Sequence, residues 1–507
     1  MLNTESLILS PREAYVAEQQ WRVVKRSVDA RQRELRVHLT ILTDEQGHPV
    51  AKDAPIPLYE PPVFQDVHNA ERQAVIIGCG PAGLFAALTL LEHGIKPVIY
   101  ERGKEVSERK KDIALLNRNE GLNAESNYCF GEGGAGTFSD GKLFSRSKKR
   151  GNMQRVMELF HYFGAPDTVL YEAHAHIGSD KLPGIIKRMR ECIIAHGGEI
   201  HFETCVKSLQ PFKIQDSKFK IPVILAIGHS AHDTYRMLAE EGVQLETKGF
   251  AMGVRIEHPQ ELINRLMYHL KPSAASRQQA ELIEYVGNAS YSMVTQVNGR
   301  GVYSFCMCPG GHIVPAGSST GTCVVNGMSA SHRNSPYANS GMVVQINPED
   351  IAGDDPLKGL AYQEALERLA FQHSAVSHQL SAAPAQRMKD FVEGKESKTL
   401  PPCSYLPGIV PSRLDQWLPA HIGKRLQQGF RDFDKKYPGF LTNEAVIVGV
   451  ESRSSSAVRI PRDPETLQSV STPLLYPCGE GAGYAGGITS SALDGINAAL
   501  KIAELAR

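Results

Sequence analysis

The chain of 507 residues carries no net charge, because 55 Lys and Arg residues balance 55 Asp and Glu residues. A balanced chain has no global field that attracts nucleic acid or an anionic membrane, so we expect neither as a partner. No apolar run is long enough to span a bilayer. The stretch 1–14 contains charges and lacks an apolar core, so we expect no signal peptide.

Cysteine is sparse and scattered, with nine residues in all and no CxxC pair. An odd, dispersed set argues against a disulfide framework and suits the reducing cytoplasm, which is the localisation we expect. No His/Cys cluster has the spacing of a zinc or iron–sulfur site, so we predict no metal. The length allows two or three domains with a substantial core, as in a large soluble enzyme.

The most informative segment is 74–83, which reads AVIIGCGPAG and combines a buried strand with a glycine-rich turn. A helix is expected over 81–93, and a second strand ends at Glu101. Strand, glycine turn, helix, strand and acid in this order predict a unit that binds an adenine dinucleotide. The alternative is a fortuitous glycine turn, because such turns are common outside this context.

Each glycine has its own part in such a turn. Gly78 permits the tight turn, Gly80 lets the backbone approach a pyrophosphate, and Gly83 lets the helix pack closely on the strand. The helix directs its N-terminal N–H groups and the positive end of its dipole at the phosphates. Glu101 lies about 20 residues downstream, where an acid accepts hydrogen bonds from a ribose diol.

Residues 1–50 stand apart from this unit. A short helix opened by proline is expected over 11–20, and residues 34–41 alternate like a half-buried strand. Five prolines between residues 49 and 63 indicate a linker. We interpret 1–50 as a small α/β domain that serves packing or dimerisation, with a role in chemistry as the alternative, and 51–70 as the linker.

The stretch 128–143 reads YCFGEGGAGTFSDGKL and is too rich in glycine for an ordinary helix or strand. It predicts a loop whose backbone amides lie against a flat or anionic ligand, with Lys142 adding a positive charge. Because it follows no strand of its own, 131–136 is not a second dinucleotide turn. A merely flexible loop is the alternative.

Further elements extend the same sheet. A helix over 180–196 and a strand over 199–206 are followed by an apolar strand from 221 that ends at Gly228, at the cofactor edge of a parallel sheet. Residues from 246 leave this pattern. The expected domains are a first dinucleotide-binding part over 71–245, a cap domain over 246–440 and a second dinucleotide-binding part over 441–507.

The segment 474–488 reads LLYPCGEGAGYAGGI and again combines an apolar strand with a glycine-rich turn, as the segment 74–83 does. It leads into an amphipathic helix over 489–505, whose N-terminus would stabilise negative charge on a reduced flavin. A simple closing helix is the alternative.

The order of Glu101, Gly228 and Gly479 with their turns resembles that of flavoproteins with a glutathione-reductase-like FAD domain. The whole chain resembles the bacterial FAD-dependent dehydrogenase family, the NAD(P)/FAD-dependent oxidoreductases of unassigned substrate. Geranylgeranyl reductases and tRNA-modifying flavoproteins are more distant relatives. The segments that carry the resemblance are 24–31, 129–143, 171–182, 305–311 and 479–495.

This resemblance implies an α/β fold: a glutathione-reductase-like FAD-binding Rossmann domain, an inserted α+β cap domain and a small N-terminal α/β domain. It implies FAD in an extended form. The implied cofactor contacts are Gly78, Gly80, Pro81, Ala82 and Gly83 at the pyrophosphate, Glu101 at the adenosine ribose, Val206 at the adenine, Gly133, Gly134, Ser139, Gly141 and Lys142 at the flavin or its phosphate side, Gly479, Glu480, Gly486, Gly487 and Ile488 at the ribityl chain and pyrimidine ring, and also Arg102 and Gly228. The segment between Val206 and Ile221, with Lys213, Lys218 and Lys220, is shorter than usual in the family.

Candidate reacting groups lie in the segment 305–312, FCMCPGGH. Cys306 and Cys308 would face the same side of a strand, and the turn after them would place both thiols near the flavin. The alternative is two small buried residues of a cap strand. His312 is the third candidate, as a proton donor, since histidine titrates near neutrality. The same role is open to His174, His176, His229 and His232, and a structural role is the alternative for each.

Arg453, Arg459 and Arg462 stand in a polar stretch that either binds an anionic substrate or forms a solvated loop. The expected function is a soluble FAD-dependent oxidoreductase that moves two electrons between a donor, with NAD(P)H as the candidate, and a small-molecule substrate. A single dinucleotide turn implies that nicotinamide visits only transiently. The alternatives are a flavin-dependent RNA-modification protein, which the basic segments 102–111 and 146–150 would serve, and a non-catalytic FAD-binding regulator.

Overall fold

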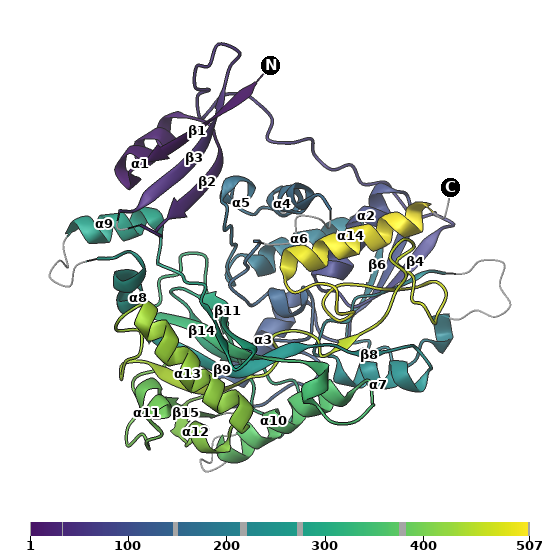
Figure 1. The fold of residues 1–507 in the computed structure, drawn as a ribbon. Coiled ribbons are helices and arrows are strands. Elements are labelled where there is room, and N and C mark those ends of the chain that lie inside the picture. Colours follow the sequence, from purple (N-terminus) through teal and green to yellow (C-terminus); the bar gives the residue numbers. More distant parts are fainter. Residues whose placement is uncertain are drawn as a thin grey trace.

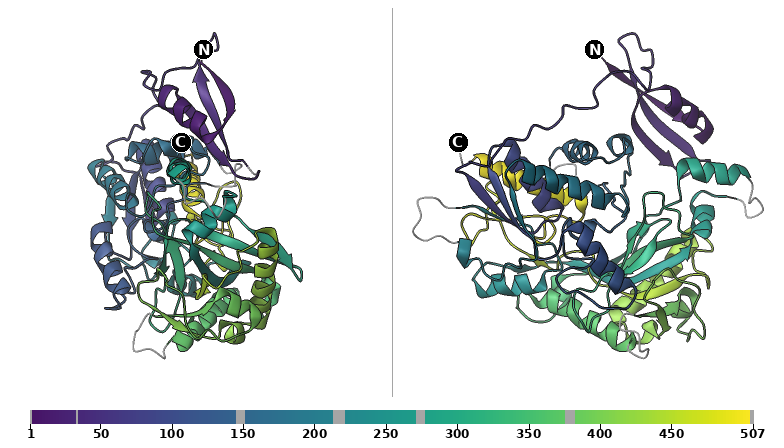
Figure 2. Two further views of the ribbon diagram at one scale, coloured as in Figure 1. Left: turned by 90° about the vertical axis from the view of Figure 1, so that its left-hand side faces the viewer. Right: turned by 180° about the vertical axis from the view of Figure 1, so that it is seen from behind.

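The computed structural model describes residues 2–32, 34–144, 151–212, 221–270, 277–374 and 382–504. The basic segment 146–150 and the lysines Lys213, Lys218 and Lys220 lie outside these ranges. Figures 1 and 2 show three units: a small N-terminal unit that projects from the rest, a unit around a parallel sheet, and a unit around a larger mixed sheet. Every helix in the described ranges is too short or too polar to cross a membrane.

The N-terminal unit is a three-stranded antiparallel sheet with one helix. Its elements are β1 (Asn3–Leu9), α1 (Pro11–Gln20), β2 (Val23–Asp29) and β3 (Arg36–Thr43), with β3 in the middle. The helix begins and ends where the sequence predicts, because Ser10 and Glu13 form a capping box around its first turn and Pro11 opens it.

The second unit contains a five-stranded sheet in which all neighbouring strands are parallel. In spatial order its strands are β19 (Leu475–Pro477), β7 (Val223–Leu225), β4 (Gln73–Ile77), β5 (Lys96–Tyr100) and β6 (Glu199–His201). The predicted strand over 199–206 ends early at His201. The backbone N–H groups of Glu203 and Thr204 instead donate to the carbonyls of Gly103 and Glu101, which turns the chain out of the sheet.

Helices α2 (Pro81–Glu92) and α14 (Ile488–Glu504) lie side by side on one face of this sheet (Figure 1). A Cβ on Gly495 would lie 2.1 Å from the carbonyl oxygen of Ala82, so the two helices approach more closely than a side chain allows. The other helices of this unit are α3 (Val106–Asn117), α4 (Met153–Tyr162), α5 (Thr168–Tyr171), α6 (Leu182–Ala195) and α7 (His232–Glu240).

The third unit, the cap, is built on a seven-stranded sheet. Its strands in spatial order are β10 (Val294–Val297), β11 (Arg300–Cys308), β14 (Tyr337–Ile346), β9 (Phe250–Pro259), β17 (Val446–Glu451), β15 (Ala383–Arg387) and β16 (Ile409–Pro411), and all pairs except β15–β16 are antiparallel. β17 belongs to this sheet, so the predicted end of the cap at residue 440 is too early. An apolar strand reads the same in either sheet, and only its pairing with β9 decides which one it joins.

The remaining cap elements surround this sheet. They are α8 (Gln260–Met267), α9 (Arg277–Val286), α10 (Lys358–Ser374), α11 (Met388–Glu393), α12 (Leu414–Trp417), α13 (Ala420–Lys436), the hairpin of β12 (His312–Pro315) and β13 (Val325–Met328), and the short pair β8 (Glu246–Thr247) and β18 (Val458–Arg459). The largest apolar core lies between the sheet and these helices, where Phe391, Phe430 and Phe440 are fully buried.

His258 on β9 is buried in this core, against the ring of Phe440. Burial lowers the pKa of His258 to about 4, because the imidazolium loses its hydration. The unfolded chain therefore takes up a proton between pH 6.5 and pH 4 that the folded chain does not, and stability falls as pH falls through this window.

Replacing His258 by glutamine should remove this pH dependence, while the amide can still donate to the Phe440 carbonyl. Between pH 7 and pH 5 the native protein should lose about 2 kcal/mol more unfolding free energy than His258→Gln. Urea titrations at both pH values measure the difference, with the exposed His48→Gln as control. Equal losses in all three proteins would contradict the assignment.

Arg26 on β2 joins the three units. Its guanidinium forms ion pairs of 2.7 Å with Glu18 of α1 and with Glu172, and lies 5.0 Å from the ring centre of Tyr285 on α9. Its backbone carbonyl accepts from the N–H of Ala173. Arg26 therefore helps to fix the N-terminal unit to both larger units, through its side chain and its backbone.

Arg26→Met should loosen the N-terminal unit and expose the linker to protease. Removing the cation leaves two partly buried carboxylates unpaired, so we expect a loss of about 1–3 kcal/mol. Thermal unfolding and limited proteolysis between residues 51 and 70 test this. Arg31→Met is the matched control, because its guanidinium is 87% exposed beside Asp29; equal effects of both changes would contradict the role of Arg26.

Candidate functional site

The first glycine turn lies between β4 and α2, and it is tightly packed at Gly78 and has free space beside the backbone at Gly80. Gly78 has φ +104°, and a Cβ there would lie 2.3 Å from the Ala226 carbonyl oxygen, so only glycine fits. At Gly80 the nearest atom to such a Cβ is the Gly134 Cα, 3.7 Å away. No side chain caps the N-terminus of α2, and Pro81 opens it. The N–H groups of this turn therefore suit a phosphate.

Glu101 holds this turn together. Its buried carboxylate accepts hydrogen bonds from the backbone N–H groups of Cys79 (2.8 Å), Gly103 (2.9 Å) and Gly131 (3.0 Å). A carboxylate has about four acceptor positions, so one remains for a ribose hydroxyl. Contact with the ribose stays a prediction, while the structure adds a positioning role that the sequence did not indicate.

Arg102 is paired with two acids. Its guanidinium forms two bonds of 2.9 Å with Asp233 and one of 2.7 Å with Glu125, and lies 4.2 Å from the ring centre of Phe130. The predicted cofactor contact of Arg102 therefore competes with an existing ion pair. Val206 lies beyond the end of β6, and its predicted contact with adenine stays a prediction.

Two further turns face the same edge of the parallel sheet with open glycines. A Cβ at Gly228, Gly486 or Gly487 would have no atom within 4 Å. Tyr235 of α7, which the sequence did not single out, joins the two turns: its buried hydroxyl donates to the Gly481 carbonyl at 2.7 Å. A Cβ on Gly481 would lie 2.5 Å from the carbonyl oxygen of Gly228. These turns form a cradle that additional side chains would fill.

The C-terminal turn is fixed by a buried ion pair. Asp494 of α14 accepts from the N–H of Gly479 at 2.7 Å and pairs with Arg462 at 2.6 Å. Next to Gly479, the Glu480 carboxylate lies 3.6 Å from Nδ1 of His229. Ile488 begins α14, and a Cβ on Gly136 would lie 2.9 Å from its side chain.

The interpretation of 451–462 as a substrate site is not supported by the pairing of its arginines. Arg462 is bound by Asp494, and Arg453 forms two buried bonds of 2.9 Å with Glu367. Both guanidiniums are therefore neutralised by acids of the chain itself, and Arg459 is exposed.

The glycine-rich loop 128–143 is anchored by Arg109, a residue that sequence reasoning missed. This fully buried guanidinium donates to backbone carbonyls at distances from 2.7 to 3.2 Å. The acceptors are Asn127, Tyr128, Gly131, Glu132 and Gly134. Burial lowers the pKa of Arg109 to about 10, so it is still a cation at neutral pH. One arginine in a charged helix carries no sequence signal of this role.

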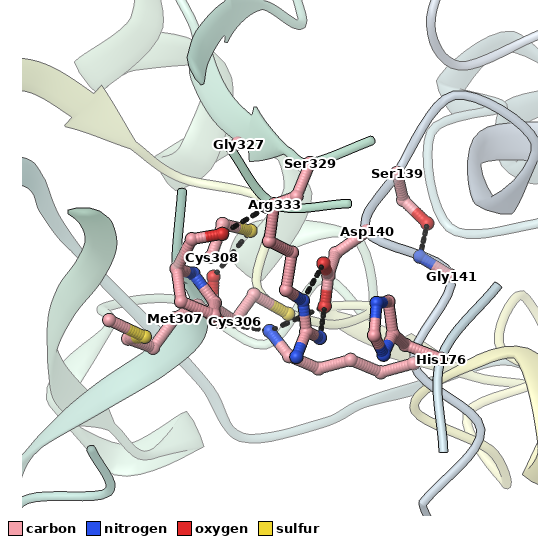
Figure 3. A network of polar contacts seen from close by, with 12 residues as sticks. Ser139, Asp140, Gly141, His176, Cys306, Met307, Cys308, Gly327, Ser329 and Arg333 are labelled. Carbon is pink, nitrogen blue, oxygen red and sulfur yellow. Dashed lines mark hydrogen bonds and ion pairs between the residues drawn. The ribbon is translucent and has the colours of Figure 1, made fainter. Parts of the chain in front are cut away.

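The loop also contacts the first turn. The N–H of Gly133 donates to the Cys79 carbonyl at 2.8 Å, and Gly134 lies against Gly80. Ser139 closes the far end of the loop, because its hydroxyl donates to the Gly136 carbonyl. The same hydroxyl accepts from the N–H of Gly141 (Figure 3). These contacts contradict a merely flexible loop.

The end of β11 carries a β-bulge at the predicted cysteine pair. The register with β14 shifts between Phe305 and Cys308, and Cys306 adopts φ +45°. The expectation that both thiols face one side is therefore wrong: Cys306 is exposed and Cys308 is buried. An inserted residue breaks the alternation of a strand, and no periodicity in the sequence reveals it.

The carbonyls of this bulge are bound by two cations from different units. Arg255 of β9 donates to the Cys306 carbonyl at 2.7 Å, and the Lys142 ammonium donates to the Met307 carbonyl. Arg255 is fully buried, with Glu451 at 2.9 Å. A Cβ on Gly327 would lie 2.2 Å from its guanidinium, so glycine is required there.

Asp140 links the loop to the cap (Figure 3). It accepts two bonds of 3.0 and 2.5 Å from Arg333, and Lys142 lies 3.4 Å away. These cations lower the pKa of Asp140 to about 2 in spite of its burial. His176 lies beside this group with Nε2 at 3.0 Å from the Ser331 carbonyl oxygen.

The other histidines are dispersed. His232 pairs with Glu364 at 2.9 Å, the exposed His174 lies against the ring of Phe144 in a tilted arrangement, and the exposed His312 begins β12. Among the described residues, neither Cys306 nor Cys308 forms a hydrogen bond with His312. No group of His, Cys, Asp and Glu suited to a metal ion occurs in the described ranges.

Comparison with known proteins decides the family. Residues 249–454 match the family described as FAD-dependent protein, C-terminal domain-like. An uncharacterized protein of Clostridium beijerinckii (strain ATCC 51743 / NCIMB 8052) is 39% identical, over 95% of this chain and 92% of that one. The chain belongs to this family of FAD-dependent proteins. FAD is its cofactor, and the open glycines of the three turns and the uncapped helix α2 fit such a group.

Solved structures with some similarity include two flavoproteins. CtdE in complex with FAD has a TM-score of 0.29 and 10% identity over 85% of this chain and 84% of that one. CmlS, a flavin-dependent halogenase, has a TM-score of 0.31 and 14% identity over 86% and 59%. TM-scores at this level do not establish a common fold.

Proposed function

We propose that this protein is an FAD-dependent oxidoreductase that transfers two electrons between a donor, with NAD(P)H as the candidate, and a small-molecule substrate. The supporting observation is the course of the loop 128–143, which lies on the first glycine turn at Gly134 and reaches the cap at Met307 through Lys142. This course suits an FAD that extends from the sheet edge to the cap in the glutathione-reductase-like manner.

Different residues along this course bind the cofactor, leave space for it and position Cys306. The N–H groups of the first turn and of α2 bind the pyrophosphate, and the open turns at Gly228 and Gly486 admit the rest of the cofactor. FAD supplies hydride and electron transfer. Arg255, Glu451 and Lys142 hold the bulge and thereby present the Cys306 thiol on the exposed side.

An anaerobic absorbance spectrum of the purified protein, before and after NADH or NADPH, tests the proposal. Bleaching of oxidised-flavin bands is the expected result. If only dithionite bleaches the bands, the assignment of FAD as cofactor stands and nicotinamide is excluded as the donor. If no physiological donor bleaches them, a non-catalytic flavin-binding regulator is favoured. Absence of flavin after reconstitution with FAD would overturn the proposal.

Cys306→Ser should slow flavin reduction or reoxidation about tenfold, equal to about 1.4 kcal/mol of barrier, while Cys308→Ser should leave both rates near those of the native protein. The reason is exposure: Cys306 can meet a substrate, whereas Cys308 donates its S–H to the Cys306 carbonyl at 3.2 Å. Anaerobic stopped-flow measurements of both half-reactions test this. Unchanged rates in Cys306→Ser would remove the thiol from the chemistry.

A further inference from the structure

The surroundings of Cys306 carry more positive than negative charge. Arg255 is matched by Glu451 at 2.9 Å, and Arg333 is matched by Asp140. Lys142 has only the same Asp140, at 3.4 Å, and a backbone carbonyl as partners among the described residues. One cation therefore lacks an acid of its own.

Neighbouring groups do not cancel this charge. Asp180 is directed to Ser331, whose N–H and hydroxyl both donate to it at 2.7 Å, and Lys181 lies beside it in the chain. Burial and the nearby Arg333 lower the pKa of His176, so it is neutral near pH 7. The surplus thus stays at Lys142, whose side chain is 38% exposed and able to meet a ligand.

Two donors are available on this surface. Arg333 uses Nε and Nη2 for Asp140, and its Nη1 donates to no described residue. The Lys142 ammonium has three N–H bonds, of which one donates to the Met307 carbonyl, while Asp140 lies 3.4 Å away as an ion-pair partner. Figure 3 shows Asp140 of the loop 128–143 facing Arg333 of the cap, with Cys306 of the cap and His176 of the segment between α5 and α6 nearby.

Backbone strain gathers at the same place. Cys306 and Arg333 have φ of +45° and +47°, a region that non-glycine residues avoid. A Cβ on Gly310 would lie 1.6 Å from the Arg333 carbonyl oxygen, so this strained turn depends on a glycine beneath it. Strain of this kind persists where surrounding contacts impose it, commonly at ligand sites.

We propose that Lys142 and Arg333 bind the carboxylate of a small organic acid, the substrate of the proposed oxidoreductase, beside Cys306. This inference rests on the proposed function and specifies the substrate class. A single surplus charge matches a monocarboxylate, whose planar group accepts from two donors at once. A phosphate dianion would bring excess negative charge against Asp140, so it should bind less well. Arg453 and Arg462, in contrast, are each neutralised by their own buried acid and offer no surplus charge.

Protection of the Cys306 thiol tests the site without any catalytic assay. Burial raises the pKa of the Cys306 thiol, so the FAD-loaded protein is alkylated with iodoacetamide at alkaline pH, where enough thiolate is present. The labelling is done in the presence of acetate or benzoate, with acetamide and benzamide as neutral counterparts and inorganic phosphate as the dianion. Peptide mass spectrometry follows labelling of Cys306. We expect the carboxylates to protect with saturation, and the amides and phosphate to require at least about tenfold higher concentration.

Lys142→Gln should weaken this protection about tenfold. Arg333→Lys should weaken the protection less, because lysine keeps the positive charge and loses only the planar arrangement of guanidinium N–H donors. Lys181→Gln is the control, since this exposed lysine lies outside the site. Equal protection by amides, or unchanged protection in Lys142→Gln, would overturn the inference. If NAD(P)H reduces the flavin but no carboxylate protects Cys306 from alkylation, the anion site alone is refuted. If the protein holds no flavin, the proposed function is refuted.

Discussion

Replacement of Arg109 by methionine is expected to destabilise the protein by about 3–5 kcal/mol and to release FAD. The guanidinium is fully buried and satisfies carbonyls from Asn127 to Gly134, and methionine fills much of the volume without a donor. Each buried carbonyl left without a partner costs about 1–3 kcal/mol, less where the loop can relax toward water. The relaxed loop would then lose its contact with the first glycine turn.

Urea unfolding and titration of the apoprotein with FAD measure the two effects separately. Lys110→Met is the matched control, because it removes a cation from the next position of the same helix, where the side chain is exposed. We expect the control to stay within about 0.5 kcal/mol of the native protein. Native FAD affinity in Arg109→Met would show that the loop does not contact the cofactor.

A second large effect is expected at Gly80. Gly80→Ala should fold normally, since a Cβ there meets nothing closer than 3.7 Å and its φ of −80° suits any residue. The added methyl would occupy the space that the pyrophosphate needs. FAD affinity should therefore fall about 10- to 100-fold, equal to about 1.4–2.8 kcal/mol.

Gly83→Ala provides the contrast. Its Cβ would lie 2.0 Å from the Gly78 carbonyl oxygen, so this change should unfold or distort the turn itself. Thermal unfolding of the two apoproteins and FAD titration by flavin fluorescence distinguish a blocked cradle from a broken fold. A Gly80→Ala protein that binds FAD as the native one does would show that the pyrophosphate lies elsewhere.

Local patterns gave reliable predictions where neighbours along the chain determine the structure. The helix 11–20 with its capping box, the turn 74–83 and the helix that follows it all depend on contacts within a few residues. The family resemblance carried by the sequence motifs also implied FAD, and the family match over residues 249–454 agrees with it.

Predictions failed where partners come from distant segments. The assignment of β17 to the FAD-binding unit and the common side of Cys306 and Cys308 both depended on pairing across the fold. Arg109, Tyr235 and Arg255 were missed for the same reason: their acceptors are carbonyls or acids brought near by folding.

The dinucleotide turn follows from the amino-acid sequence, because steric limits on glycine, proline and a buried strand act locally and allow few alternatives. The electrostatics of the site, in contrast, arise only on folding. Lys142, Arg333 and Arg255 come from three separate segments, and only their approach to Asp140 and Glu451 fixes which charge is paired and which is left for a ligand. Coulomb interactions depend on distance in space and on burial, and neither can be read from spacing along the chain.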